Sequence, residues 1–141
     1  MSTVDVELPA EAASAAAARR VVRALLADVG PHGGTRSDQG ALDRVLLLTS
    51  EIVTNAILHA RTPLRLTASL DGGQVRVRVY DRLRLLPRLR SYPTDAGTGR
   101  GMHLVEALAD QWGVEETANG KCVWFAVAVA VVAEEQKARL G

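Results

Sequence analysis

Hydrophobic and polar residues alternate with a period of two in several short stretches of the chain. The pattern is clearest in residues 64–70 and 74–80, on either side of Asp71-Gly72-Gly73, and it predicts a β-hairpin. Leu and Val hold one set of alternate positions and Arg and Thr the other, so we expect one covered and one exposed face. Further strands are predicted at residues 4–8, 111–116 and 121–129, the last two joined across Asn119-Gly120.

A period of between three and four residues predicts three helices. Their ranges are 10–28, about 38–60, and 102–109. The first is rich in Ala and is closed by a loop of Gly and Pro at residues 30–34. The second starts at Asp38 or Gly40 and ends near His59, because Pro63 forces the chain out of the helix.

The order of the elements indicates the fold. Antiparallel strands with helices gathered on one face predict an α+β fold, a two-layer α/β sandwich with a mixed, mostly antiparallel sheet. No repeat or interdomain linker is visible, so residues 1–141 are expected to form one domain. We interpret residues 82–101 as a lid, because such long connections in small domains are usually functional or mobile. Residues 132–141 are expected to be a polar tail.

Composition narrows the class of protein. A chain of 141 residues can bury a core without disulfides or metals. A net charge of +1 with 4% aromatic residues argues against direct nucleic-acid binding. The single cysteine, Cys122, excludes an internal disulfide and a multi-cysteine metal site. The acidic start is not a secretion signal and the longest apolar run, residues 122–133, is too short for a membrane span, so we expect a cytoplasmic protein.

Three polar residues interrupt the apolar pattern of the second helix. Glu51, Asn55 and His59 are four residues apart, and each such step turns the helix by only about 40°, so they share one narrow stripe. A carboxylate and a carboxamide offer oxygen ligands to Mg²⁺, and Glu51 can also deprotonate a hydroxyl or water. The competing interpretation is that Glu51 and Asn55 lie at an exposed edge and pair with neighbours. His59 and His103 lack further ligands at metal-binding spacing.

Two more motifs follow the first hairpin. Asp81 ends an apolar strand, where a buried carboxylate can accept an amino group such as that of a purine; alternatively, it starts a turn. Gly97-Thr98-Gly99-Arg100-Gly101 precedes the last helix. Glycines there let backbone N–H groups approach phosphate oxygens beside a helix N-terminus, and Arg100 can add a charge-assisted contact.

The order of these motifs is more specific than any one of them. Glu-x-x-x-Asn on a helix, a hairpin, Asp, a lid and Gly-x-Gly opening a helix resemble the N, G1 and G2 boxes of the GHKL, or Bergerat-fold, ATPases. The likeness is greatest to small stand-alone members, the anti-sigma factor serine/threonine kinases and related ATP-binding regulators of actinomycetes. Residues 50–60, 99–109 and 120–125 carry the resemblance, which extends over roughly residues 8–129.

The resemblance implies a histidine-kinase-like ATPase fold and gives the motifs their roles. Asn55 would hold Mg²⁺, Glu51 would activate the attacking hydroxyl, and Asp81 would accept the adenine amino group. The remaining residues of the lid, the phosphate cradle and the nucleotide contacts would be Gly97, Gly99, Arg100, Gly101, Met102 and His59.

The implied function is that of an ATP- and Mg²⁺-dependent protein serine/threonine kinase. In the resembling family, the attacking hydroxyl belongs to a serine of an anti-anti-sigma partner with a STAS domain, and the kinase also sequesters a sigma factor. The resembling kinases form homodimers, so a homodimer is also an expectation for this chain.

The chain departs from the family pattern at the G1 box. The usual Asp-x-Gly is replaced by Asp81-Arg82-Leu83, and a side chain at position 83 is expected to crowd the base. Cys122 stands where the resemblance predicts Thr; a small core residue is the expected role, since a thiol is a poor hydrogen-bonding group. The alternative function is therefore a catalytically weak or inactive module that acts only by sequestering a partner.

Overall fold

A computed structural model describes residues 2–33, 39–84 and 99–129, which form one sheet and three helices. In chain order the elements are β1 (Ser2–Leu8), α1 (Ala13–Gly33), α2 (Gln39–His59), β2 (Leu64–Asp71), β3 (Gln74–Asp81), α3 (Gly99–Leu108), β4 (Gln111–Glu116) and β5 (Lys121–Ala128). The strand order is β1-β2-β3-β5-β4, and each described pairing is antiparallel.

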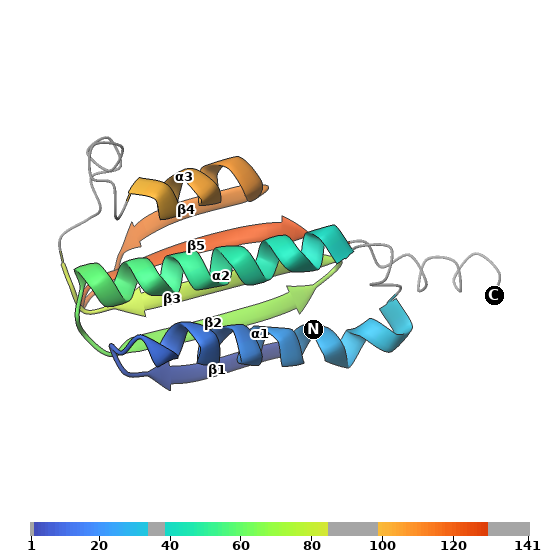
Figure 1. Cartoon of the computed structure of the whole chain (residues 1–141), viewed down its shortest axis with the longest axis horizontal. Helices are drawn as coiled ribbons and strands as arrows, with labels where there is room; N and C mark the ends of the chain where they lie inside the picture. Colours follow the sequence, from blue (N-terminus) through green and yellow to red (C-terminus); the bar gives the residue numbers. More distant parts are fainter. Residues whose placement is uncertain (1, 34–38, 85–98, 130–141) are drawn as a thin grey trace.

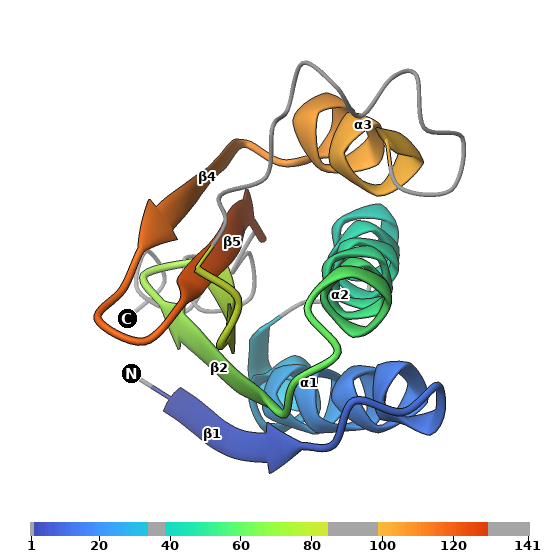
Figure 2. The same ribbon diagram turned by 90° about the vertical axis from the view of Figure 1, so that its left-hand side faces the viewer.

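The three helices lie on one face of the sheet, so the molecule has two layers (Figures 1 and 2). α1 covers β1 and β2, α2 covers β3 and β5, and α3 lies beside β4. The predicted α+β two-layer sandwich is confirmed, although the described part of the sheet is antiparallel rather than mixed. Within the described ranges, no helix has the length and apolar character needed to cross a membrane.

The core lies between the layers because both periodic patterns direct apolar side chains there. The inward positions of β2, β3 and β5 are buried and face the apolar side of α2. The largest fully buried side chains include Leu48, Ile52, Leu66, Val77, Val79 and Phe125. The β2–β3 turn places Gly72 and Gly73 at φ of 61° and 80°, as a two-residue turn of type I′ requires.

The five predicted strands and both hairpins are confirmed, with ends that differ by at most two residues. α1 differs more, because residues 9–12 form a turn in which the Pro9 carbonyl accepts hydrogen bonds from Glu11 N and Ser14 Oγ at 2.8 and 2.6 Å. The helix then continues past the predicted stop to Gly33. Gly30 disfavours a helix by about 1 kcal/mol and Pro31 by about 3 kcal/mol, so local propensity does not explain this extension.

α3 begins three residues before the predicted helix. Gly99, Arg100 and Gly101 therefore form its first turn, not a loop before it. Residues 85–98 of the predicted lid, which include Gly97, and the predicted tail at 132–141 lie outside the described residues.

Candidate functional site

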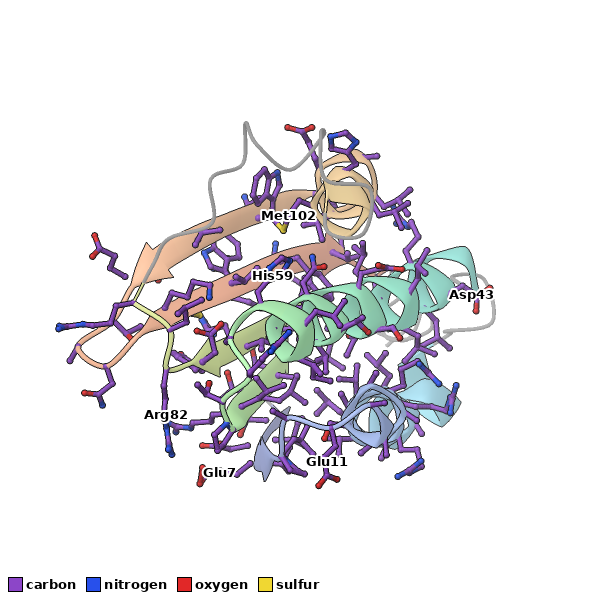
Figure 3. The ribbon with its side chains drawn as sticks, turned by 60° about the vertical axis from the view of Figure 1, so that its left-hand side comes forward. Glu7, Glu11, Asp43, His59, Arg82 and Met102 are labelled. Atoms are coloured by element: carbon purple, nitrogen blue, oxygen red, sulfur yellow. The ribbon has the colours of Figure 1, made fainter. Side chains whose placement is uncertain are left out.

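A small cavity lies where α2, α3 and the neighbouring ends of β3 and β5 meet. Its described lining residues are Ile52, Asn55, Ala56, His59, Asp81, Met102, Lys121 and Val123. Its volume is about 20 Å³, which is room for about one water molecule. Figure 3 shows His59 on α2 below Met102 on α3. Four residues predicted to bind a nucleotide, Asn55, His59, Asp81 and Met102, are thus brought together.

Asn55 reaches this cavity from the polar stripe of α2. Its Nδ2 atom is buried and has no hydrogen-bond partner among the described residues. An unpaired buried amide costs about 1–3 kcal/mol, so a ligand that pairs with it is favoured. The O and N ends of a carboxamide are assigned from hydrogen bonding, so either can face the ligand. Glu51, one turn earlier, is half-buried and is not among the described residues that line the cavity.

Lys121 holds the carboxylate of Asp81. The β3–β5 register pairs the two residues directly, and both are buried. The Lys121 Nζ atom donates a hydrogen bond to Oδ1 at 3.0 Å. It also lies 2.8 Å from Oδ2, which accepts no aligned hydrogen bond, so the negative charge of that oxygen is balanced by the ammonium charge alone. The Leu83 N–H also donates to Oδ1, at 2.9 Å. With side chains 1% and 6% exposed, Asp81 and Lys121 form a buried ion pair.

Gly120 allows β5 to approach the end of β3 at this point. A Cβ atom at position 120 would overlap the carbonyl oxygen of Asp81 and would stand 2.7 Å from the Cα atom of Arg82. Thr117 fixes the preceding turn: its N–H donates to the Gly120 carbonyl and its Oγ1 accepts from the Gly120 N–H, each at 3.0 Å. The turn therefore sets Lys121 level with Asp81.

α3 directs its N-terminal end toward the cavity. Met102 in its first turns is buried and lines the cavity, whereas the Leu108 carbonyl at its other end accepts a long hydrogen bond from Arg44 Nη1 at 3.4 Å. Because Arg44 lies early in α2 and Asn55 late, α3 runs opposite to α2. The backbone of residues 99–101 is consequently near Asn55, where a helix N-terminus favours an anion such as phosphate.

The altered G1 box does not fill the cavity. The Arg82 N–H donates to Thr62 Oγ1 at 3.0 Å, and the Leu83 N–H turns back to Asp81. Figure 3 shows Arg82 at the edge of the molecule. Neither Arg82 nor Leu83 is among the described lining residues. Of the two residues that contact the Asp81 carboxylate, Lys121 lines the cavity and Leu83 does not.

A larger hollow of about 330 Å³ lies elsewhere, near the same end of the sheet. Its lining residues are Glu7, Pro63, Leu64, Arg65, Tyr80, Asp81, Arg82, Thr117, Ala118 and Asn119. Among its described lining residues, Asp81 alone belongs to the predicted nucleotide residues, and none comes from α2 or α3. Size alone therefore does not make it the candidate site.

Cys122 faces away from the candidate site. It is paired with Tyr80 on the opposite face of the sheet, and burial raises the pKa of its thiol to about 11. It is a buried, neutral residue, in agreement with the predicted core role.

Lys121 was not predicted as a site residue. The alternation of β5 could have indicated it, because position 121 lies on the same inward face as Val123 and Phe125.

The donor set fits a magnesium ion that is held mainly by phosphate and water. Within residues 2–33, 39–84 and 99–129, no group of three or more His, Cys, Asp or Glu side chains could hold a metal alone. The carboxamide oxygen of Asn55, which lines the cavity, can supply the one protein ligand that such an ion needs.

An asparagine on α2, an aspartate at the end of β3 and the first turns of α3 lie together above the antiparallel sheet of this two-layer α/β domain. The family model described as the histidine kinase-like ATPase domain matches residues 8–127, which is most of the chain. The chain therefore belongs to the histidine kinase-like ATPase domain family. ATP is the ligand that this membership implies, in a kinase-type, ATP-using role.

Two solved structures match this chain, the first of them with a similar fold. The RsbU and RsbW domains of Rv1364c from Mycobacterium tuberculosis match with a TM-score of 0.67 and 21% identity over 92% of this chain, which spans only 33% of that one. The histidine kinase domain of the Erythrobacter litoralis EL346 blue-light activated histidine kinase matches with a TM-score of 0.48 and 29% identity, over 70% of this chain and 47% of that one. A search of curated proteins gave no match.

Proposed function

We propose that this chain is an ATP- and Mg²⁺-dependent serine/threonine protein kinase of the anti-sigma factor type. Its substrate is a serine of an anti-anti-sigma partner with a STAS domain, and it also sequesters a sigma factor. Family membership supports the use of ATP. The motif resemblance in residues 50–60 and 99–109 supports the narrower assignment.

One observation supports the nucleotide site most directly. Asn55, Asp81 and Met102 come from α2, β3 and α3, yet all three line one cavity. The amide of Asn55 is buried there without a partner among the described residues. This is the arrangement expected if α2 supplies the metal ligand, β3 the base contact and α3 the phosphate contacts.

In the proposed reaction, Asn55 would hold a Mg²⁺ ion, whose charge would balance that of the phosphates. Glu51 accepts the proton of the partner's serine as the serine oxygen bonds to the γ-phosphorus and ADP leaves. Asp81 accepts the adenine amino group, and His59 and Met102 contact the nucleotide. The N-terminal turn of α3, residues 99–101, holds the phosphates, and Gly97 belongs to the lid. Phosphoryl transfer requires mainly positioning and charge, which such a sparse site can supply.

Calorimetry with Mg·ATP tests the nucleotide site. Wild type is expected to bind, and Asn55→Ala to bind about tenfold more weakly or worse, since a hydrogen bond to a charged group contributes about 1.5–3 kcal/mol. Gln111→Ala is the matched control, because it removes an exposed amide from β4. Equal affinities for Asn55→Ala and Gln111→Ala would contradict the role of Asn55.

Transfer of labelled phosphate to STAS-domain proteins of the same organism tests the kinase assignment. Glu51→Ala is expected to lower the rate by about 10²–10⁴-fold, as loss of a general base does, with ATP binding retained. Glu11→Ala is the control, because Glu11 is exposed in the turn before α1, away from Met102 (Figure 3). Labelling that survives Glu51→Ala would remove Glu51 from the reaction.

A module that acts only by sequestration is the second candidate. The observation that favours it is the buried Lys121 beside Asp81 in a cavity of about 20 Å³. Capture of a sigma factor or STAS protein by the wild-type chain, with equal affinity in Asn55→Ala and with no phosphate transfer, would establish this function in place of the kinase.

A further inference from the structure

The residue proposed to recognise the base is already engaged within the protein. Both carboxylate oxygens of Asp81 lie within 3.0 Å of Lys121 Nζ, and Oδ1 also accepts the Leu83 N–H. Hydrogen bonds from either donor to the carboxylate are charge-assisted, but only the ammonium adds the attraction between opposite charges, which is strong in a buried pair. Adenine therefore meets a stronger competitor at Asp81.

The same side chain also lines the small cavity beside Asp81. This cavity is about 20 Å³, room for about one water molecule, so a purine that reaches Asp81 must displace a lining side chain. Ile52 and Val123 belong to the packed core, with exposures of 1% and 9%. Lys121 has a long, flexible stem and a charge that water stabilises, so it can move outward at low conformational cost.

We propose that Lys121 is the affinity-determining residue of the nucleotide pocket: its ammonium competes with the adenine amino group for Asp81 and must withdraw before ATP binds. This inference rests on the proposed ATP site at Asp81. The buried ion pair and the small cavity carry it together, because both obstacles are removed by one movement of one side chain.

Three substitutions in β5 test the inference. Lys121→Thr shortens the side chain and removes its charge, while a hydroxyl remains to pair with Asp81 and a β-branched residue suits the strand. Lys121→Arg keeps the cation. Cys122→Thr introduces the same residue one position along, on the face of the sheet away from the pocket. Lys121→Gln, which is neutral but nearly as long, replaces Lys121→Thr if that variant does not fold.

Calorimetry with Mg·ATP and the ATP-induced shift in melting temperature should rank the ATP affinities of wild type and the variants in the same order. Lys121→Thr is expected to bind about tenfold more tightly than wild type, as when a competing charge-assisted bond is removed. Lys121→Arg and Cys122→Thr should stay within about threefold of wild type. With ITP, whose base has a carbonyl in place of the amino group, the gain from Lys121→Thr should be smaller, because an acceptor oxygen then stands where adenine presents the donor that Lys121 competes with.

The outcomes separate this inference from the proposed function. Tighter binding by Lys121→Thr, with unchanged Cys122→Thr, supports the inference even if binding to wild type is too weak to measure. Binding by wild type that is equal or weaker in folded Lys121→Thr overturns it and leaves the ATP site intact. An equal gain for ATP and ITP overturns the competition for the amino group. No binding by wild type, Lys121→Thr or Lys121→Gln overturns the ATP site itself.

Discussion

Two ion pairs join neighbouring strands of the sheet, one on each face. Asp5 and Arg65 join β1 and β2 through contacts of 2.6 and 3.0 Å, with side chains 52% and 55% exposed. Asp81 and Lys121 join β3 and β5 through contacts of 2.8 and 3.0 Å, with side chains 1% and 6% exposed. The exposed pair has the better hydrogen-bond geometry, with two nitrogens directed at two oxygens, yet the buried pair bears on the candidate site.

Access to water, rather than distance, separates the two pairs. In the exposed pair each charge is solvated whether or not the partner is present, and salt screens the attraction. In the buried pair neither charge can be left alone without a large desolvation cost. A substitution or a ligand that separates Lys121 from Asp81 must therefore supply another partner for the buried carboxylate. Because this ion pair also joins β3 to β5, strand pairing and the chemistry of the pocket are linked.

Removing the buried carboxylate should have the largest effect. Asp81→Ala leaves the Lys121 ammonium buried and unpaired, which should lower the free energy of unfolding by about 3–5 kcal/mol. The double variant Asp81→Ala/Lys121→Met removes both charges and should recover much of that loss. Urea denaturation of the two variants and wild type measures both quantities. A double variant no more stable than Asp81→Ala would show that packing, not charge, holds this end of β3.

Glycines on the two faces extend the comparison. A Cβ atom at position 120 would overlap the Asp81 backbone, whereas one at position 113 would stand 2.8–3.1 Å from the indole of Trp124 on the outer face. Gly120→Ala should cost about 1–3 kcal/mol by overpacking, because backbone cannot rotate away. Gly113→Ala should cost less, since the indole can shift. Thermal unfolding compares the stabilities of the two variants. A larger loss in Gly113→Ala than in Gly120→Ala would mean that the β4–β5 turn shifts more easily than the side chain of Trp124.

The fold was predictable because two periods dominate the chain. Alternation in residues 64–70 and 74–80 located the hairpin, and the polar stripe from Glu51 to His59 marked the helix that carries the site. The start of α1 was missed because it depends on local hydrogen bonds to the Pro9 carbonyl, which a hydrophobic pattern does not encode.

The part of the site that was missed depends on which residues face each other across strands. Comparison with the family pattern draws attention to residues that depart from it, such as Leu83 and Cys122. The β3–β5 register instead places Lys121 opposite Asp81 and turns Cys122 to the other face. The alternation along β5 shows which face of the sheet residue 121 lies on. Only the register of β3 and β5 shows which residue lies opposite it.

A smaller, pH-dependent effect on stability is expected from Cys122, which is buried on the outer face of the sheet. Burial raises the pKa of its thiol to about 11, so the folded chain keeps the proton that an unfolded chain loses above about pH 8.5. Stability from this group is complete below about pH 8.5 and falls as the pH rises toward 11. The decline across this range should be shallower in Cys122→Ala. Native wild type should react slowly with iodoacetamide at pH 8, and rapid reaction without unfolding would contradict the burial.

The smallest effect is expected for the exposed pair. Arg65→Ala should change the midpoint of urea unfolding only slightly, and the change should vanish near 1 M salt, where the screening length is about 3 Å. Hydrogen bonds from Arg65 lower the pKa of Asp5, so any stabilisation is present above the unfolded pKa of about 3.9 and is lost as the pH falls through the lower folded value. Wild type and Arg65→Ala should therefore converge in acid. Arg65→Ala could instead lower the free energy of unfolding as much as Asp81→Ala does, with as little dependence on salt. That result would mean that the geometry of the contact, rather than its burial, decides how much each ion pair stabilises the protein.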